Sequence, residues 1–433
     1  MKDSLWLKES TLPSFPALEE DLRVDVLIVG GGMAGILCAY QLHQKGISHA
    51  LIEADTILGG VTGNTTAKIT SQHGLCYHKL LKQFDEKTAK GYYQIHQEAI
   101  RQYEALASKI DCDFLRTNHY VYETGTPGEL EKEIQALQKL GIPVVYTETL
   151  GIPVKISGAI GFLHQAQFDP VKFIAGIVKD LPIYEHTKAQ EFVGNTVKTG
   201  RCRIHARKII LATHFPILNK HGGYFLKLYQ QRSYVVALEN AGKVEGMYLG
   251  EGKEGLSFRN AGDLLLLGGG SCRTGKKSGG WQMLEQKAKQ LYPGAAVKYR
   301  WATQDCMSLD GIPYIGQYSP GTPDLYVATG FNKWGMTSSM VAAGILTDLV
   351  AGRKNLYAPI FAPDRSLLRP QLFRNAAEST WNLVRPTAPR CPHLGCALHW
   401  NKQEHSWDCS CHGSRFSEEG TLLDGPATGD LPK

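Results

Sequence analysis

Four potential metal ligands near the end of the chain have the residue types and spacing of an electron-transfer centre. They lie in two short segments, Cys391-Pro-His393 and Cys409-Ser-Cys411-His412. Two thiolates and two imidazoles suit an asymmetric two-iron, two-sulfide cluster, in which Cys391 and Cys409 would hold one iron. The two histidines would hold the other iron and raise the reduction potential. The pattern therefore predicts a carrier of single electrons.

Other centres use the same residue types. A structural zinc ion would need only four of the six cysteines and histidines in this region, and it leaves the order Cys409-Ser-Cys411-His412 unexplained. A knot of disulfides is the second alternative. The pattern resembles the Rieske proteins, in the branch with an additional cysteine in each cluster loop. This resemblance implies a disulfide between Cys396 and Cys411.

A glycine-rich segment near the start of the chain predicts a dinucleotide site. An apolar run at residues 24–29 is typical of a buried parallel strand, and a helix is expected at 36–45. The intervening glycines fit G-x-G-x-x-G, which allows a tight turn, close approach of a pyrophosphate and helix–strand packing. These glycines are Gly30, Gly32 and Gly35. Glu53 ends the next strand, where an acidic side chain accepts hydrogen bonds from a ribose.

The rest of the chain favours FAD over NAD. A second loop at residues 59–66 is expected to contact phosphate and flavin through Gly60, Thr62, Thr65 and Thr66. A strand at 325–330 leads into a loop at 331–337 that opens a helix. These features resemble the D-amino-acid oxidase superfamily, which includes glycine, sarcosine and γ-glutamylputrescine oxidases. The resemblance implies FAD contacts at Ala189, Gly330, Trp334, Gly335, Met336 and Thr337.

The predicted fold class is α/β, with a Rossmann-like FAD-binding domain, an interleaved α+β substrate domain and a small all-β cluster-binding subdomain. A chain of 433 residues is too long for one compact core. We expect the FAD-binding domain at 20–76, 162–214 and 317–362, and the substrate or cap domain at 77–161 and 215–316. A linker at 363–385 would precede a minimal Rieske subdomain at 386–433.

The cluster-binding segment departs from the Rieske pattern in two ways. Instead of several strands, a predicted helix at 373–383 precedes the first cluster loop. A hairpin at 397–400 and 406–409 would then form a subdomain too small to fold alone, docked on the flavin domain. Ser414 matches a serine that donates to cluster sulfur in high-potential relatives, whereas Phe416 replaces the corresponding tyrosine. We therefore expect a potential between the respiratory and the low-potential oxygenase types.

The substrate side differs from the oxidase family at one position. The family places a carboxylate-binding arginine shortly before a D-G-x-P-x-I-G signature, which here begins at Asp310. Asp305 occupies the position of that arginine, where it would repel a carboxylate and attract an amine or polyamine cation. Binding of a backbone amide is the alternative role. Further pocket candidates are His73 as a proton acceptor, Arg273, Trp334, Lys68 and Arg232.

The composition gives no support for nucleic-acid or membrane binding. The net charge is +6 at pH 7, without a basic cluster, and the longest apolar runs are much shorter than a membrane span. The first residues carry no export signal, so a cytoplasmic location is expected.

Together these features predict an FAD-dependent oxidoreductase with a fused Rieske 2Fe-2S cluster. An amine or amino acid would pass a hydride to flavin N5, and the cluster would relay single electrons from reduced FAD to an external acceptor. A reductase that runs the reverse way from a soluble donor stays open as an alternative. A non-catalytic redox sensor is the other.

Overall fold

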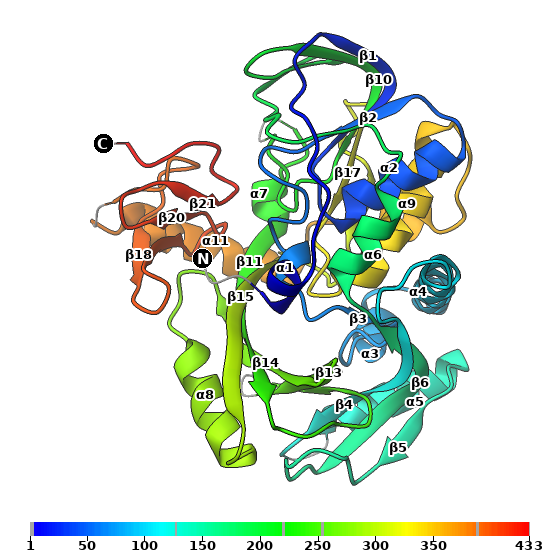
Figure 1. Cartoon of the computed structure of the whole chain (residues 1–433), viewed down its shortest axis with the longest axis vertical. Helices are drawn as coiled ribbons and strands as arrows, with labels where there is room; N and C mark the ends of the chain where they lie inside the picture. The colour runs from blue at the N-terminus through cyan, green and yellow to red at the C-terminus, as the bar shows by residue number, and fades with distance from the viewer. Residues whose placement is uncertain (1–3, 126–127, 219–220, 253–254, 387–388, 433) are drawn as a thin grey trace.

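The computed structural model describes residues 4–125, 128–218, 221–252, 255–386 and 389–432. It contains two large sheets and a small third one, with the N-terminal helix α1 (Leu5–Glu9) lying between the large sheets (Figure 1). Within these residues no helix combines the length and apolarity needed to cross a membrane. The mixed α/β class and the all-β tail expected from the sequence are confirmed.

The first sheet carries the nucleotide-binding motif. Its order is β16-β17-β10-β1-β2-β7, and the β8–β9 hairpin joins the sheet because β9 pairs with β10. The central strands are parallel, and the last four residues of β1, 26–29, are all buried, which explains why they are all apolar. The strands are β1 (Leu22–Val29), β2 (His49–Ile52), β7 (Ile183–Tyr184), β8 (Glu191–Val193), β9 (Thr196–Lys198), β10 (Arg203–Leu211), β16 (Tyr314–Gln317) and β17 (Leu325–Thr329).

Two almost wholly apolar helices pack together on this sheet. They are α2 (Met33–Gln44) and α9 (Gly335–Val350), and most of their residues are buried. Each begins directly after a strand of the sheet, α2 after β1 and α9 after β17. Their N-terminal N–H groups, which have no partner within a helix, therefore lie at the carboxyl edge of the strands.

The second sheet has the order β15-β11-β14-β13-β12-β4-β6-β3, with β5 added to β6. Helices α3 (Tyr77–Gln83), α4 (Glu86–Ala107) and α5 (Gly128–Leu140) pack at its β4–β6 end, and α8 (Gly280–Leu291) packs on β11 and β14. The strands are β3 (Lys68–Ile69), β4 (Leu115–Glu123), β5 (Val145–Thr147), β6 (Gly158–Gln167), β11 (Leu228–Glu239), β12 (Met247–Gly250), β13 (Ser257–Ala261), β14 (Leu264–Arg273) and β15 (Ala296–Ser308).

The long helix α4 shows how the sequence specifies this part of the fold. Asp85 caps its N-terminus by accepting a hydrogen bond of 2.7 Å from the Thr88 backbone N–H. Tyr92, Ala99 and Tyr103 are among its buried residues, which recur at the spacing of one helix face. Capping and burial on one face therefore define α4 as an amphipathic helix.

The chain passes from one large sheet to the other at positions that differ from the expected domain boundaries, and three strands show this. β3 and the whole of β6 belong to the second sheet, because β6 pairs with both β3 and β4. β16 belongs to the first sheet, because it pairs with β17. The chain therefore crosses between domains later than 161 at the end of β6, and earlier than 316 at β16.

The third sheet forms the cluster-binding subdomain and is antiparallel. Its order is β18-β19-β20-β21, with β18 (Leu398–Asn401), β19 (Ser406–Cys409), β20 (Arg415–Ser417) and β21 (Leu422–Asp424). The predicted hairpin corresponds to β18 and β19. The helix α11 (Pro370–Val384) precedes it and packs against the short helix α7 (Tyr224–Lys227). In Figure 1 the subdomain, drawn in orange and red, lies on the opposite side of the molecule from α4 and α5.

Candidate functional site

Two of the three motif glycines are required by their backbone surroundings. Gly30 has φ +116°, and a Cβ atom there would lie 2.6 Å from the Ala212 carbonyl oxygen. A Cβ atom at Gly35 would lie 1.9 Å from the Gly30 oxygen, so this glycine lets α2 pack on β1. Gly32 is the N-cap residue of α2, and a Cβ atom there would lie 3.4 Å from the Thr62 hydroxyl oxygen. The turn thus brings exposed backbone N–H groups to one end of a cavity.

This first cavity has a volume of about 520 Å³. Glu53 lines it and accepts hydrogen bonds from the Gly31 and Asp55 backbone N–H groups at 2.7 and 3.0 Å. These bonds fix the carboxylate at the end of β2 and leave lone pairs for ribose hydroxyls. The predicted cofactor contacts that line the cavity are Gly30, Gly32, Glu53, Gly60, Thr62, Thr65, Ala189, Gly330, Gly335 and Met336.

The other predicted cofactor contacts lie around this cavity. Thr62 also accepts a hydrogen bond from the Met33 N–H at 3.0 Å, which ties the second loop to the start of α2. Thr337 is buried and donates to the Thr70 carbonyl at 3.0 Å, so it supports the start of α9 from behind. Thr66 and Trp334 line a neighbouring cavity. The glycine turn, the acidic residue and the N-termini of α2 and α9 together fit FAD.

The second cavity has a volume of about 750 Å³ and lies against the second sheet. The two cavities share part of their lining, which includes residues of β15 and of the loop before α9. The shared residues are Thr65, Thr303, Asp305, Lys333, Gly335 and Met336. A substrate in the second cavity would therefore meet a cofactor in the first cavity at this boundary.

Asp305 is the acidic residue of this boundary. It lies on β15, half-buried, and lines both cavities. Burial raises its pKa to about 6, and the positive charges of Lys333 and Arg232 act in the opposite direction. Lys333 has a left-handed backbone, with φ 73°, and its ammonium group contacts the Ser271 hydroxyl. The boundary thus contains a carboxylate that ionises near neutral pH, with cations beside it.

His73 lines the second cavity, but its ring nitrogens are both engaged by protein groups. Nδ1 lies 2.7 Å from the Tyr92 hydroxyl, and Nε2 lies 2.8 Å from the Thr70 carbonyl. Burial lowers the pKa of His73 well below its usual value, so the ring is neutral. The ring stacks on Trp334 at a centroid distance of 4.9 Å. This geometry makes His73 a support for Trp334 and gives no opening for its expected role as proton acceptor.

The remaining basic candidates have structural partners. Lys68 donates to the Tyr248 carbonyl and the Ser257 hydroxyl, both at 2.7 Å, and burial lowers its pKa. Arg273 lies outside the described lining of both cavities. Its guanidinium donates to the carbonyl oxygens of Ser410 at 2.6 Å and Cys411 at 2.8 Å. Arg273 therefore connects β14 to the second cluster loop and does not face the substrate cavity.

The sequence pattern did not single out two residues that line the second cavity. Gln371 and Arg374 reach it from α11, a helix that was expected to act only as a linker. Arg374 is exposed and has no ion pair among the interactions of the described residues. Helical spacing predicts α11 itself, but no local pattern shows which distant cavity a helix will border.

The predicted cluster ligands lie close together, in the two loops beside the third sheet. Cys391, Cys409 and His412 are each less than 5% exposed, and the rings of His393 and His412 are 4.9 Å apart. Nδ1 of His412 is buried without a hydrogen-bond partner among the described residues, as a metal-ligating nitrogen would be. Cys396 and Cys411 form the expected disulfide, and its sulfur atoms lie within 4.8 Å of the Cys409 sulfur. This donor set fits a 2Fe-2S cluster.

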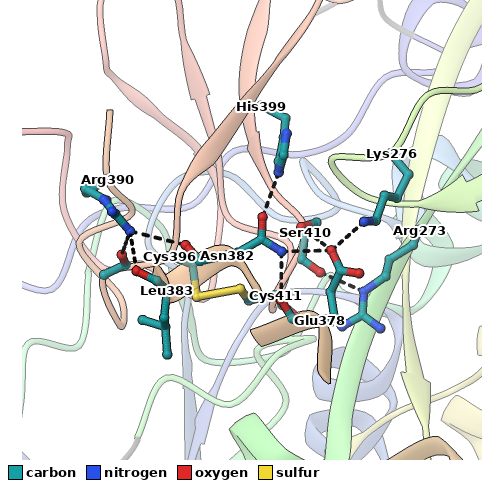
Figure 2. The surroundings of a disulfide bond; sticks show 11 residues. Arg273, Lys276, Glu378, Asn382, Leu383, Arg390, Cys396, His399, Ser410 and Cys411 are labelled. Atoms are coloured by element: carbon teal, nitrogen blue, oxygen red, sulfur yellow. Dashed lines mark hydrogen bonds and ion pairs between the residues drawn. A yellow bond between two sulfur atoms is a disulfide. The ribbon is translucent and has the colours of Figure 1, made fainter. Parts of the chain in front are cut away.

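Helix α11 is tied to the loops that surround this disulfide (Figure 2). The Glu378 carboxylate accepts hydrogen bonds from the Ser410 hydroxyl at 2.7 Å and from Asn382, and it pairs with Lys276 of the oxidase part at 2.6 Å. Asn382 also contacts His399 of β18 at 2.8 Å. The helix therefore holds the cluster loops against the rest of the molecule.

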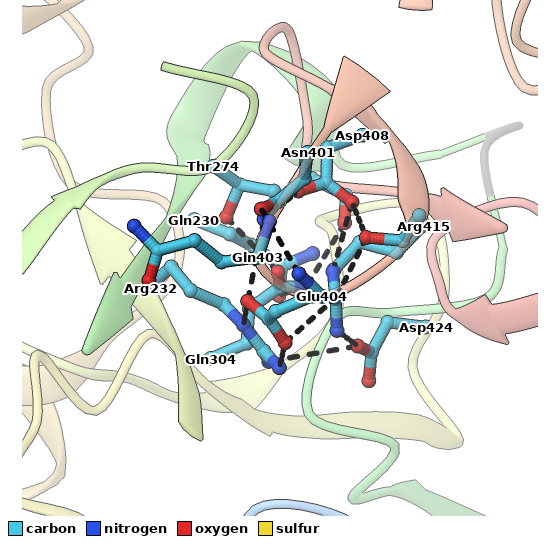
Figure 3. A network of polar contacts seen from close by, with 12 residues as sticks. Gln230, Arg232, Thr274, Gln304, Asn401, Gln403, Glu404, Asp408, Arg415 and Asp424 are labelled. Atoms are coloured by element: carbon cyan, nitrogen blue, oxygen red, sulfur yellow. Dashed lines mark hydrogen bonds and ion pairs between the residues drawn. The ribbon is translucent and has the colours of Figure 1, made fainter. Parts of the chain in front are cut away.

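A buried ionic network forms the second contact between these parts (Figure 3). Arg232 of β11 pairs with Glu404, which follows β18 and lies in the hairpin turn. Arg415 of β20 pairs with Glu404 at 2.9 Å, Asp408 at 3.0 Å and Asp424 at 3.0 Å. Burial opposes ionisation of Glu404, but the two arginines outweigh it and lower its pKa to about 2.

The wall of the first cavity lies close to the cluster histidines. Phe215 is buried and lines the cavity, and its ring centroid lies 6.3 Å from His393 and 6.4 Å from His412. Gln230 also lines the cavity and donates to the His412 carbonyl at 2.8 Å. Residues of the cavity wall thus lie directly beside both histidines.

Comparisons with known proteins agree with these two sites. The profile of the FAD dependent oxidoreductase family (DAO) matches residues 25–349, and that of the Rieske [2Fe-2S] domain matches residues 378–433. YhfW of Bacillus subtilis (strain 168), named as a Rieske 2Fe-2S iron-sulfur protein, is 35% identical across 98% of this chain and 96% of its own. The γ-glutamylputrescine oxidoreductase of Escherichia coli (strain K12) is 21% identical across 78% of this chain and 86% of its own.

Solved structures show the same fold for the oxidase part. Glycine oxidase from Geobacillus kaustophilus superposes with a TM-score of 0.67 at 19% identity, covering 80% of this chain and 99% of the glycine oxidase. The chain belongs to the FAD dependent oxidoreductase family and carries a C-terminal Rieske [2Fe-2S] domain.

Proposed function

We propose that this oxidoreductase oxidises a small amine and delivers the electrons through its Rieske cluster to an external one-electron acceptor. When bound, FAD takes up the two electrons of the oxidation and the cluster carries them one at a time. The amine loses a hydride and a proton to give an imine, and water hydrolyses the imine to a carbonyl compound. Two equivalents of the one-electron acceptor complete the balance.

The position of Phe215 carries the proposal of an internal relay. Its side chain lines the first cavity, and its ring lies at centroid distances of 6.3 and 6.4 Å from the rings of His393 and His412. Gln230, which also lines the cavity, donates to the His412 backbone carbonyl. Because electron-transfer rates fall steeply with distance, this contact favours transfer between the two centres over two independent sites.

Charges in the second cavity support the substrate class. Asp305 at the boundary of the cavities attracts an ammonium group, whereas Arg374 on α11 offers a guanidinium elsewhere in the lining. A guanidinium binds a carboxylate through two parallel hydrogen bonds. The arrangement favours a substrate with a basic nitrogen at one end and a carboxylate or other acceptor group at the other. Trp334 and the start of α9 close the wall beside the reacting nitrogen.

An anaerobic titration of the loaded enzyme tests this function. Simple amines, polyamines and N-substituted amino acids would be added while the flavin absorbance and the low-temperature EPR spectrum are followed together. We expect an effective substrate to bleach the flavin while a Rieske-type EPR signal grows in step. Bleaching with a cluster that stays oxidised would refute the relay.

The same titration separates the alternatives. If no amine bleaches the flavin but dithionite produces the Rieske signal, both centres are present and the substrate class is wrong. A cluster potential well below that of the flavin would instead support the reverse direction, from a soluble donor to the flavin. The Arg374→Gln variant in the same assay should lose affinity for substrates with a carboxylate and keep its affinity for simple amines.

A further inference from the structure

The Rieske domain contributes a wall to the FAD cavity. Every residue from 422 to 428, at the end of β21 and beyond it, lines the first cavity together with the glycine turn. These residues lie outside the part of the chain that matches the oxidase family, which ends at 349. We infer that the 422–428 segment is part of the FAD-binding site, so that FAD binding and cluster binding strengthen each other. The inference holds for either direction of electron flow.

Two contacts fix this segment to the oxidase part. Gln230 of β11 donates to the Gly425 carbonyl at 2.9 Å, and Lys188 donates to the Thr428 carbonyl at 2.9 Å. Lys188 adjoins Ala189, and both line the cavity. The segment thus connects two separate parts of the cavity wall. Gln230 belongs to the second sheet, and Lys188 lies between β7 and β8 of the first sheet.

The other side of the segment is bonded to the second cluster loop. The Ala427 N–H donates to the Ser414 hydroxyl at 3.0 Å, and the Ser414 carbonyl accepts from the Cys409 N–H at 2.8 Å. Cys409 and His412 are cluster ligands within this loop, and the Gly413 N–H bonds back to the Cys409 carbonyl at 2.9 Å. Ordering of the loop by a bound cluster therefore orders the segment that lines the FAD cavity.

Arg415 holds the start of the segment through its charge and its geometry. It is 2% exposed and lines neither cavity in the described structure, yet it bonds Asp424, which does line the first cavity. The same guanidinium bonds Glu404, which also pairs with Arg232 of the cavity wall. Arg415 is therefore a positioning residue for this wall, since it acts on the cavity only through Asp424 and Glu404.

Coupling of this kind is reciprocal. If the cluster increases the affinity for FAD by some factor, FAD must increase the stability of the bound cluster by the same factor. Coupling between sites in proteins commonly amounts to about five- to 150-fold in affinity.

The variant Arg415→Lys tests the inference in the full-length, cluster-loaded protein. Lysine keeps the charge but loses the planar fork that binds three carboxylates at once. After removal of the flavin, FAD is titrated back and its Kd is measured from the quenching of flavin fluorescence, with EPR confirming that the cluster is present. We expect the Kd to rise by about five- to 150-fold.

The matched control is Arg390→Lys, the same substitution in the same domain. Arg390 donates to the carbonyl oxygens of Asn382, Leu383 and Gly395, away from the 422–428 segment. The FAD Kd of this control should equal that of the wild type. Equal Kd values for wild type and Arg415→Lys would overturn the inference.

A second measurement needs no variant, and it decides the matter if Arg415→Lys does not fold. Iron release from the wild-type protein to a chelator is timed with and without bound FAD. FAD should slow the release by a factor similar to the coupling. Identical rates of release would also overturn the inference, whatever the enzyme does to amines.

Discussion

Asp305 is the residue on which the proposed substrate class depends. It lies where the two cavities meet. A hydrogen bond to a charged group contributes about 1.5–3 kcal/mol, so Asp305→Asn should lower kcat/KM for amines by roughly ten- to a hundredfold. The isosteric asparagine keeps the shape of the cavity, and unchanged FAD binding would serve as the control.

The pH dependence of the same residue has a definite sign. Because burial raises the pKa of Asp305 to about 6, its carboxylate becomes fully ionised only above that pH. The value of kcat/KM for a cationic amine should therefore rise as the pH increases through 6 and level off above it. Stopped-flow measurement of flavin reduction between about pH 5 and pH 8 would show this rise of kcat/KM with pH in the wild type. If Asp305→Asn kept the rise, another group would be responsible.

Phe416 sets the other residue-scale prediction. It is buried on β20, opposite Trp407 of β19, in the sheet that holds the cluster ligands. The neighbouring Ser414 hydroxyl is available in the second loop, but phenylalanine cannot donate a hydrogen bond to a cluster sulfur. Because such bonds stabilise the reduced cluster, Phe416→Tyr should raise the reduction potential measured by redox titration, and Ser414→Ala should lower it. A tyrosine variant with an unchanged potential would show that its hydroxyl does not reach the cluster.

Helix α11 is the element that holds the cluster loops in place. Burial opposes ionisation of Glu378, but bonds from Lys276, Ser410 and Asn382 outweigh it and lower its pKa. Removing one partner of such a set costs about 1–3 kcal/mol, so Glu378→Ala should destabilise the docked Rieske domain by ~2 kcal/mol. Release of the cluster under mild denaturant would report this change, and Glu419→Ala, on an exposed turn of the same domain, is the control.

The sign of the pH effect follows from the lowered pKa. The contribution of Glu378 is complete above the ordinary carboxyl pKa, and it is lost as the pH falls through the lower pKa of the folded state. The docked Rieske domain of the wild type should therefore be more stable than that of Glu378→Ala at neutral pH, and this difference in stability should disappear in acid. A difference that persisted at low pH would point to packing of the side chain and not to its charge.

At the scale of elements, sequence patterns predict what is local. The glycine turn, the helix at 373–383 and the β18–β19 hairpin follow from glycine spacing, helical periodicity and strand alternation, and the structure contains each of them. The contribution of α11 to the second cavity could not be predicted in this way. Gln371 and Arg374 line that cavity, and Glu378 and Asn382 of the same helix bond to Lys276, Ser410 and His399, which are distant in the sequence.

Across the whole molecule, the separation between cavity and cluster makes a kinetic prediction. Phe215→Leu removes an aromatic ring that borders the first cavity and lies close to both imidazoles, while keeping an apolar side chain. Flavin reduction by substrate should change less than cluster reduction, because Phe215 is not among the described residues that line the second cavity. Reduction of the cluster should be slower, as rapid freeze-quench EPR would measure. Slowing of both steps together would assign Phe215 to the flavin site alone.

The types of cofactor could be predicted from the sequence, because each depends on short motifs or on resemblance, and the family matches agree with them. The cluster ligands and the domain boundaries stay predictions. The bonding partners of His73 and Arg273 could not be predicted. The residue type alone does not show whether a histidine or an arginine has a structural or a catalytic role. Only the docked structure shows Arg273 bonded to the carbonyl oxygens of Ser410 and Cys411.

The 422–428 segment has a consequence for how the enzyme is made. Residues that line the FAD cavity begin at Val29 and end at Thr428, so the cavity is incomplete until almost the entire chain has left the ribosome. Domains generally fold in the order of their synthesis. Here the nucleotide-binding part would fold first, and its cavity would stay open on one side until residues 422–428 are added. If the cluster orders the tail, as inferred above, iron–sulfur insertion would precede tight binding of FAD. In cells starved of iron, this enzyme should then accumulate with less FAD bound than in iron-replete cells.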